Sequence, residues 1–162
     1  MLPDKILLAG IPGTGKSTFA NMLAAGDGFV HFDKEKPEWP QPEAREVWNR
    51  VPTQFIGSIK GDRIILNWGF PVQCIDIVKQ IVDGGYTFIW FTGEIKCARE
   101  FYLQGEHKDN IVGFDNQVRD ITDTDCPASL NKPFIRVDVF KEGCEHKTFE
   151  EIFAEINSFE CE

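Results

Sequence analysis

The stretch Ile6-Leu-Leu-Ala-Gly10-Ile-Pro-Gly13-Thr14-Gly15-Lys16-Ser17-Thr18 decides the fold that we expect of this chain. Its later part, GIPGTGKS, matches the phosphate-binding loop (Walker A) pattern GxxxxGK[ST] at all four fixed positions. Glycines permit positive φ angles, so that backbone N–H groups can converge on phosphate oxygens. The Lys16 ammonium supplies charge for the β- and γ-phosphates, and the Ser17 hydroxyl is a ligand for Mg²⁺. We therefore assign nucleoside triphosphate binding to Gly10, Ile11, Pro12, Gly13, Thr14, Gly15, Lys16, Ser17 and Thr18.

The residues on both sides of this loop have the pattern that the motif requires. After Lys5, residues 6–9 form a continuous apolar run, as expected of a strand that is buried on both faces. Phe19, Met22 and Leu23 recur at helical spacing, which predicts a helix from Gly15 to about Ala25. A chance glycine-rich turn is disfavoured, because the flanks and the fixed positions agree. A loop that binds phosphate without catalysis remains an open alternative.

Strand and helix signals alternate along the rest of the chain. Short apolar segments predict four further strands, and amphipathic segments between them predict helices. The strands are expected at 28–32, 63–67, 86–91 and 133–138, the helices at 43–50, after Pro71, at 94–104, at 116–121 and after the capping box Thr148-x-x-Glu151. This order indicates an α/β fold with a five-stranded, mostly parallel sheet in one domain, residues 1–162. Ligands of such sheets bind at the carboxyl ends of the strands.

Composition restricts the class of protein. The 162 residues carry a net charge of −9, which disfavours nucleic acid as a partner because non-specific binding requires clustered Lys and Arg. Several glutamates gather near the end of the chain, where we expect a solvated helix face and an acidic tail. No apolar run has membrane length and no secretion signal precedes the first strand, so we expect no membrane partner and a cytoplasmic location. The five cysteines contain no CxxC pair, which predicts reduced thiols rather than disulfides or zinc ligands.

The phosphate loop and the order of the elements resemble the P-loop kinases of small molecules and nucleotides. This group includes nucleoside monophosphate kinases, shikimate kinase, gluconate kinase and the kinase domain of phage polynucleotide kinase. The resemblance implies a three-layer P-loop NTPase fold, ATP and Mg²⁺ as cofactors, and phosphoryl transfer to a hydroxyl group. ATP is favoured over GTP because Asn131-Lys132 lacks the Asp of a guanine-reading motif and precedes a strand.

The second strand of these kinases ends in acidic residues, and Phe29-Val-His-Phe-Asp33-Lys34-Glu35 resembles it. The resemblance implies that Asp33 accepts the proton of the acceptor hydroxyl or orients Mg²⁺, together with Ser17. Glu35 is the second candidate for the same role. The alternative for Asp33 is a residue that only forms a turn.

The segment after the third strand, Asn67-Trp68-Gly69-Phe70-Pro71, resembles the DGFPR segment of nucleoside monophosphate kinases. Asn67 (or Trp68, in the other alignment) replaces the acid, and Val72 replaces the arginine. Asn67 can bind a metal-bound water but cannot act as a base at neutral pH. These differences argue against a nucleoside monophosphate acceptor and leave loss of catalysis open.

The helix after the fourth strand carries lid arginines in these kinases, and here it supplies Arg99. The resemblance implies that Arg99 neutralises charge on the transferred phosphoryl group. An exposed helix arginine is the equally weighted alternative.

These residues define three hypotheses of function. The first is an ATP-dependent phosphotransferase for a small hydroxyl-bearing acceptor that the sequence does not specify, with Lys16, Asp33 and Arg99 as catalytic residues. The second is a nucleotide-binding regulatory protein with little turnover. The third is a polynucleotide 5′-hydroxyl kinase, which the acidic charge disfavours.

Overall fold

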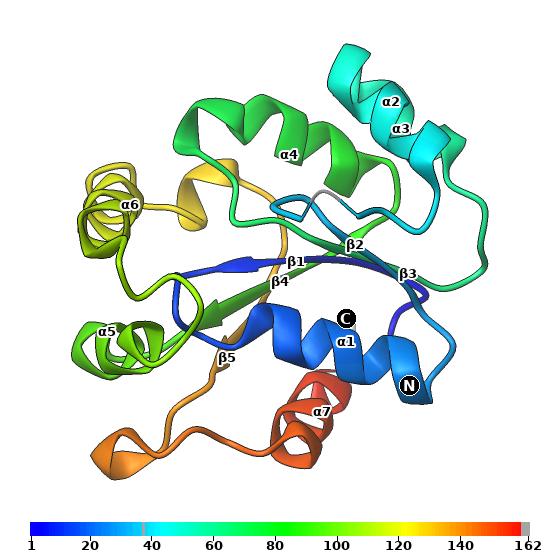
Figure 1. Cartoon of the computed structure of the whole chain (residues 1–162). Coiled ribbons are helices and arrows are strands. Elements are labelled where there is room, and N and C mark those ends of the chain that lie inside the picture. Colours follow the sequence, from blue (N-terminus) through cyan, green and yellow to red (C-terminus); the bar gives the residue numbers. More distant parts are fainter. Residues whose placement is uncertain (37, 160–162) are drawn as a thin grey trace.

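A parallel β-sheet forms the centre of the molecule (Figure 1). The structure is a computed structural model that describes residues 1–36 and 38–159, so the expected tail residues Glu160 and Glu162, and Cys161, lie outside the described residues. The strand order is β2-β3-β1-β4-β5, and every neighbouring pair is parallel. The strands are β1 (Lys5–Gly10), β2 (Val30–Asp33), β3 (Ile64–Asn67), β4 (Thr87–Thr92) and β5 (Ile135–Asp138). The predicted α/β fold and the five strands are confirmed.

Alternation along β1 explains why the sheet is covered on both faces. Ile6 and Leu8 belong to one apolar cluster, whereas Leu7 and Ala9 belong to another. Successive side chains of a strand point to opposite faces, so an uninterrupted apolar run needs packing partners on both sides. The result is a layer of helices above the sheet and another below it (Figure 1).

Helices α1 (Lys16–Gly26) and α7 (Phe149–Ser158) cover one face, whereas α2 (Pro42–Arg50), α3 (Phe55–Ser58) and α4 (Ile75–Asp83) cover the other (Figure 1). Helices α5 (Ile95–Leu103) and α6 (Ile111–Asp123) follow the carboxyl end of β4. Short 3₁₀ helices occupy Pro52–Gln54 (η1), Val72–Cys74 (η2), Ala128–Leu130 (η3) and Glu142–Cys144 (η4). None of the helices in the described part of the chain is long and apolar enough to span a bilayer.

Most predicted helices appear with shifted ends. The Thr148–Glu151 capping box is present and begins α7. The prediction for 116–121 was too short, because α6 begins at Ile111 with Asn110 as its N-cap. The segment 52–58 was not predicted as helical, and η1 and α3 lie there.

One prediction about the cysteines was wrong, because Cys97 and Cys144 form a disulfide. Cys97 lies in α5 and Cys144 in η4, and their Cα atoms are 5.0 Å apart, within the range that a disulfide can bridge. Sequence spacing gave no sign of this pair, since the two residues are separated by 47 positions. They meet because β4 and β5 are neighbours and both segments begin at the same edge of the sheet.

Candidate functional site

The phosphate loop joins β1 to α1 in a left-handed backbone conformation. Gly13 and Gly15 have φ angles of 74° and 76°. A Cβ atom on Gly13 would lie 2.2 Å from the backbone oxygen of Ala98 in α5, so only glycine fits there. Helix α1 begins at Lys16, and its first N–H groups therefore have no acceptor inside the helix. This arrangement is suited to an anion.

Lys16 is held inside the loop by backbone oxygens. Its Nζ donates hydrogen bonds to the carbonyl oxygens of Ile11 at 2.8 Å and Gly10 at 3.4 Å. Burial lowers the pKa of the Lys16 ammonium to about 8, and the carboxylates of Glu35 and Asp33 oppose this shift. The ammonium is therefore poorly solvated and donates to neutral oxygens, and a polyphosphate would offer it anionic acceptors at hydrogen-bond distance.

Three polar side chains meet at the carboxyl ends of β2 and β3, next to the start of α1. The Ser17 hydroxyl donates to Asp33 Oδ2 at 3.0 Å, and Asn67 Nδ2 donates to Ser17 Oγ at 2.8 Å. Asn67 Nδ2 also lies 3.3 Å from Asp33 Oδ2. Asp33 and Asn67 are opposite each other in the register of β2 and β3, which is why residues 34 positions apart are in contact. A hydroxyl and a carboxylate at this distance are oxygen ligands of the kind that Mg²⁺ prefers.

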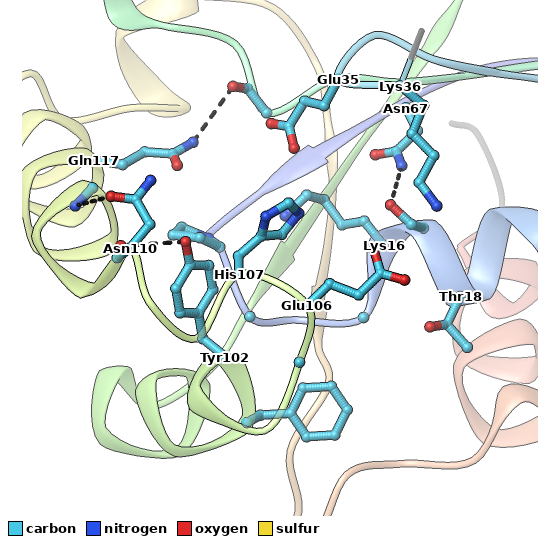
Figure 2. Close-up of a pocket in the computed structure, with 18 of the residues that line it drawn as sticks. Lys16, Thr18, Glu35, Lys36, Asn67, Tyr102, Glu106, His107, Asn110 and Gln117 are labelled. Atoms are coloured by element: carbon cyan, nitrogen blue, oxygen red, sulfur yellow. Dashed lines mark hydrogen bonds between the residues drawn. The ribbon is translucent and has the colours of Figure 1, made fainter. Parts of the chain in front are cut away.

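A cleft of about 600 Å³ opens above the phosphate loop (Figure 2). On one side it is lined by the loop and the start of α1, and on the other by residues after β2, residues after β3 and the α5–α6 region. The polar side chains that line it are Lys16, Ser17, Thr18, Asn21, Glu35, Lys36, Asn67, Tyr102, Glu106, His107, Asn110 and Gln117. The cleft therefore extends well beyond the space around the phosphate loop.

Asp33 and Arg99 lie differently from what their predicted roles suggested. Asp33 contacts Ser17, but it is 7% exposed and is not among the residues that line the cleft. Glu35, the second candidate, does line it, and its backbone N–H donates to Asp33 Oδ1 at 3.1 Å. Arg99 is exposed, pairs with Asp115 of α6 at 3.4 Å and is likewise not among the lining residues.

Three lining residues on the α5–α6 side of the cleft were not among the residues that the sequence indicated. Tyr102, Asn110 and Gln117 line this side, and Tyr102 Oη donates to the backbone oxygen of Asn110 at 3.3 Å. The available signal was Asn110 before the apolar pair Ile111-Val112, which is a typical N-cap position. The predicted helix 116–121 already contained Gln117, but only an extension back to the cap would have brought the start of α6 next to Tyr102 and the cleft.

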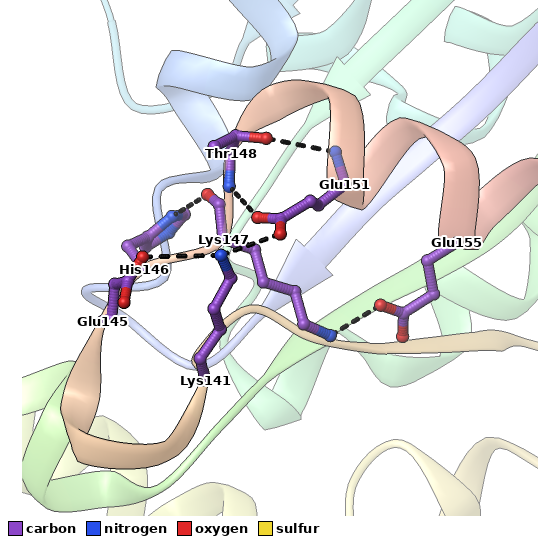
Figure 3. A network of polar contacts seen from close by, with 7 residues as sticks. All are labelled: Lys141, Glu145, His146, Lys147, Thr148, Glu151 and Glu155. Atoms are coloured by element: carbon purple, nitrogen blue, oxygen red, sulfur yellow. Dashed lines mark hydrogen bonds and ion pairs between the residues drawn. The ribbon is translucent and has the colours of Figure 1, made fainter.

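The segment between β5 and α7 also reaches the phosphate loop. His146 Nε2 lies 3.2 Å from the backbone oxygen of Thr14, and its ring stacks on Phe101 with centroids 4.9 Å apart. Figure 3 shows the polar contacts that hold this segment, including Lys141 to Glu151 at 2.7 Å and Lys147 to Glu155 at 2.6 Å. Together with the disulfide, these contacts hold residues 141–147 in place, and His146 of this segment contacts the phosphate loop at Thr14.

Comparison with solved structures identifies the fold as that of P-loop kinases. A gluconokinase from Sinorhizobium meliloti 1021 superposes with a TM-score of 0.59 at 16% identity over 96% of this chain and 90% of that chain. A shikimate kinase from Acinetobacter baumannii, in complex with shikimate, gives 0.60 at 15% identity over 98% and 94%. A shikimate kinase from Bacteroides thetaiotaomicron gives 0.58 at 11% identity over 97% and 96%. No protein-family model and no curated protein sequence matches this chain.

Proposed function

We propose that this protein is an ATP-dependent phosphotransferase that acts on a hydroxyl group of a small molecule. The observation that carries the proposal is the extent of the cleft, which runs from the phosphate loop past Glu35 and Gly69 to Gln117. A protein that only bound nucleotide would need the first part alone. A second compartment beside the phosphate loop is what in-line transfer to an acceptor requires.

The residues present suit Mg²⁺. Ser17 and Asp33 would hold the ion, directly or through water, and Asn67 would fix the orientation of both by its hydrogen bonds. Bound Mg²⁺ supplies charge neutralisation for the phosphates. Lys16 exchanges its backbone acceptors for phosphate oxygens, while the loop N–H groups orient the triphosphate.

We propose that Asp33, the last residue of β2, and Glu35, two residues later, share the two roles for which the sequence favoured Asp33. Asp33 is buried, and both of its oxygens already accept hydrogen bonds, so it serves the metal side. Glu35 lines the cleft and is exposed, so it can receive the proton of an acceptor hydroxyl. Arg99 remains our candidate for charge neutralisation at the lid, a role that requires its guanidinium to leave Asp115. One kinase domain over 1–162 and a cytoplasmic location complete the proposal.

A regulatory nucleotide-binding protein is the second candidate, favoured by the amide of Asn67 at a position where an acid is typical. A polynucleotide kinase is less well supported, because Glu35 and Glu106 line the described cleft together with only two lysines. The cleft therefore lacks the basic groove that a polynucleotide would need.

The test is a coupled assay for ADP formation with Mg·ATP and a panel of small alcohols, run beside calorimetric binding of ATP. We expect turnover that depends on the acceptor and disappears in Glu35→Gln, while Glu35→Gln keeps its affinity for ATP. ATP binding without acceptor-dependent turnover across the panel would favour the regulatory protein instead.

A further inference from the structure

One part of the cleft is formed by three segments that meet at Gly69. Gly69 follows the end of β3, and its backbone oxygen accepts a hydrogen bond from Gln117 Nε2 at 3.4 Å. A Cβ atom on Gly69 would lie 3.3 Å from Gln117 Nε2 and 3.3 Å from Glu35 Oε1. Glu35 and Gln117 therefore flank the same small space, which is open because residue 69 has no side chain. We call Glu35, Gly69, Tyr102 and Gln117 the acceptor wall.

The side chains of the acceptor wall are suited to hydroxyl groups. The Glu35 carboxylate accepts hydrogen bonds, the Gln117 amide both donates and accepts, and the Tyr102 ring adds an apolar face with a polar tip. Burial raises the pKa of the Tyr102 phenol, and the charge of the Glu35 carboxylate raises this pKa further. In Figure 2 Tyr102, Asn110 and Gln117 lie on one side of the cleft, and Lys36 lies on the other side beside Asn67.

The charge of the acceptor wall is the wrong sign for an anionic acceptor. None of the described residues that line the cleft is an arginine, the side chain that reads carboxylates and phosphates in a bidentate manner. The lining lysines are Lys16, which belongs to the phosphate loop, and Lys36 on the far side. A carboxylate or phosphate on the acceptor would face Glu35 with no arginine among the described lining residues to bind it, and like charges at close range oppose binding.

We propose, resting on the function proposed above, that the acceptor is an uncharged polyhydroxylated compound, a sugar or sugar alcohol, which binds by its hydroxyl groups between Glu35 and Gln117. One hydroxyl donates to the Glu35 carboxylate, and a neighbouring hydroxyl exchanges hydrogen bonds with the Gln117 amide. When the first hydroxyl attacks the γ-phosphorus, its oxygen forms the new P–O bond, the bond to ADP breaks, and its proton passes to Glu35. The Glu35 carboxylate thus has two effects in this proposal, because it accepts the proton and its negative charge disfavours an anionic acceptor.

The experiment compares matched pairs that differ in one carboxylate. Alditols and aldoses are tested beside their aldonates, for example glucitol beside gluconate, with shikimate as a further carboxylate. Each compound is measured for ADP formation with Mg·ATP and for binding to the protein loaded with Mg²⁺ and a non-hydrolysable ATP analogue. We expect neutral members of the pairs to exceed their acids about tenfold or more in kcat/KM or in affinity.

Two variants sharpen the result. Gln117→Arg introduces the missing cation, and we expect it to shift the neutral-to-acid ratio about tenfold or more toward the acid. Glu100→Gln removes an exposed carboxylate of α5 that does not line the cleft, and it should leave the ratio unchanged.

A preference for the carboxylates in the unmodified protein would overturn the inference and leave the proposed kinase activity standing. Absence of binding by every neutral compound to the nucleotide-loaded protein would overturn it as well. Failure of the protein to bind Mg·ATP at all would instead overturn the proposed function, and the inference would fall with it.

Discussion

The two ends of the cleft differ in how their polar groups are held. At the phosphate end, Ser17, Asp33 and Asn67 contact one another, and Lys16 is fixed by backbone oxygens. At the acceptor end, Glu35 is exposed and extends from a turn, and Gln117 of α6 makes one long hydrogen bond, at 3.4 Å, to the backbone oxygen of Gly69. The phosphate end, where we propose that the nucleotide binds, is therefore pre-organised, whereas the residues of the proposed acceptor end can change without disturbing the sheet.

Removal of the Lys16 ammonium should give the largest change in ligand affinity, and this change should concern Mg·ATP alone. We expect Lys16→Ala to lower the affinity for Mg·ATP about a hundredfold or more, because truncating one partner of a desolvated charge pair costs about 2–5 kcal/mol. Isothermal titration calorimetry measures the change. The control is Lys108→Ala, an exposed lysine near the cleft that does not line it. Equal affinity for Mg·ATP in the Lys16 variant and the unmodified protein would mean that the triphosphate does not bind at this loop.

The disulfide connects the two regions, because Cys97 belongs to the helix that leads to the acceptor end and Cys144 to the segment that carries His146 against the loop. We expect the double variant Cys97→Ser, Cys144→Ser to lower the free energy of unfolding by about 2–4 kcal/mol. Denaturant unfolding measures this change, and Cys74→Ser, which alters a free cysteine, is the control. Thiol counting on protein purified under alkylating conditions tests whether the bond exists in the cytoplasm that we propose. An unchanged midpoint would mean that the bond does not restrain the chain.

Substitutions in the Ser17–Asp33–Asn67 cluster should change the affinity for ATP only when Mg²⁺ is present. We expect Asp33→Asn to lower the affinity for Mg·ATP about 10- to 100-fold and to leave the affinity for metal-free ATP nearly unchanged, as is typical of groups that orient metal ligands. Titrations with and without Mg²⁺ separate the two. Glu35→Gln is the matched control at the other end of the same turn, and it should leave both affinities unchanged. A loss of equal size in both titrations of Asp33→Asn would point to folding rather than to Mg²⁺.

The lowered pKa of Lys16 predicts a pH dependence at the phosphate end. Burial lowers the pKa of Lys16 to about 8, and a bound polyphosphate favours the ammonium and raises this pKa again. Binding therefore takes up protons above about pH 8, so affinity should fall about tenfold or less between pH 8 and 9. Below pH 7 the free protein already carries the ammonium, and this group should cause no change. Calorimetry across this range tests the point, and the slope above pH 8 should vanish in Lys16→Ala.

Arg99 should give a small effect because it is held away from the cleft. We expect Arg99→Ala to lower kcat about tenfold, less than the ~10²-fold loss of a donor that is already aimed at the reacting group. Its ion pair with Asp115 is exposed, so the change in stability should stay below about 1 kcal/mol. Steady-state kinetics with the Asp115→Asn variant distinguishes the roles. An equal loss of kcat in that variant would mean that the pair only orders α5 against α6.

The amino-acid sequence by itself determined the phosphate loop, where we propose that the nucleotide binds, and the class of the fold. The phosphate loop is a local structure, since its glycines, lysine and hydroxyl lie within nine residues, and the apolar run before it requires a sheet covered on both faces. The position of Asp33 at a strand end could also be predicted, because it depends only on the residues next to it in the sequence. Only the tertiary structure decided that Asn67 meets Asp33, that Glu35 and Gln117 flank Gly69, and that Cys97 bonds to Cys144. These pairs are brought together by strand register and by the packing of α6, and spacing along one chain carries no record of either.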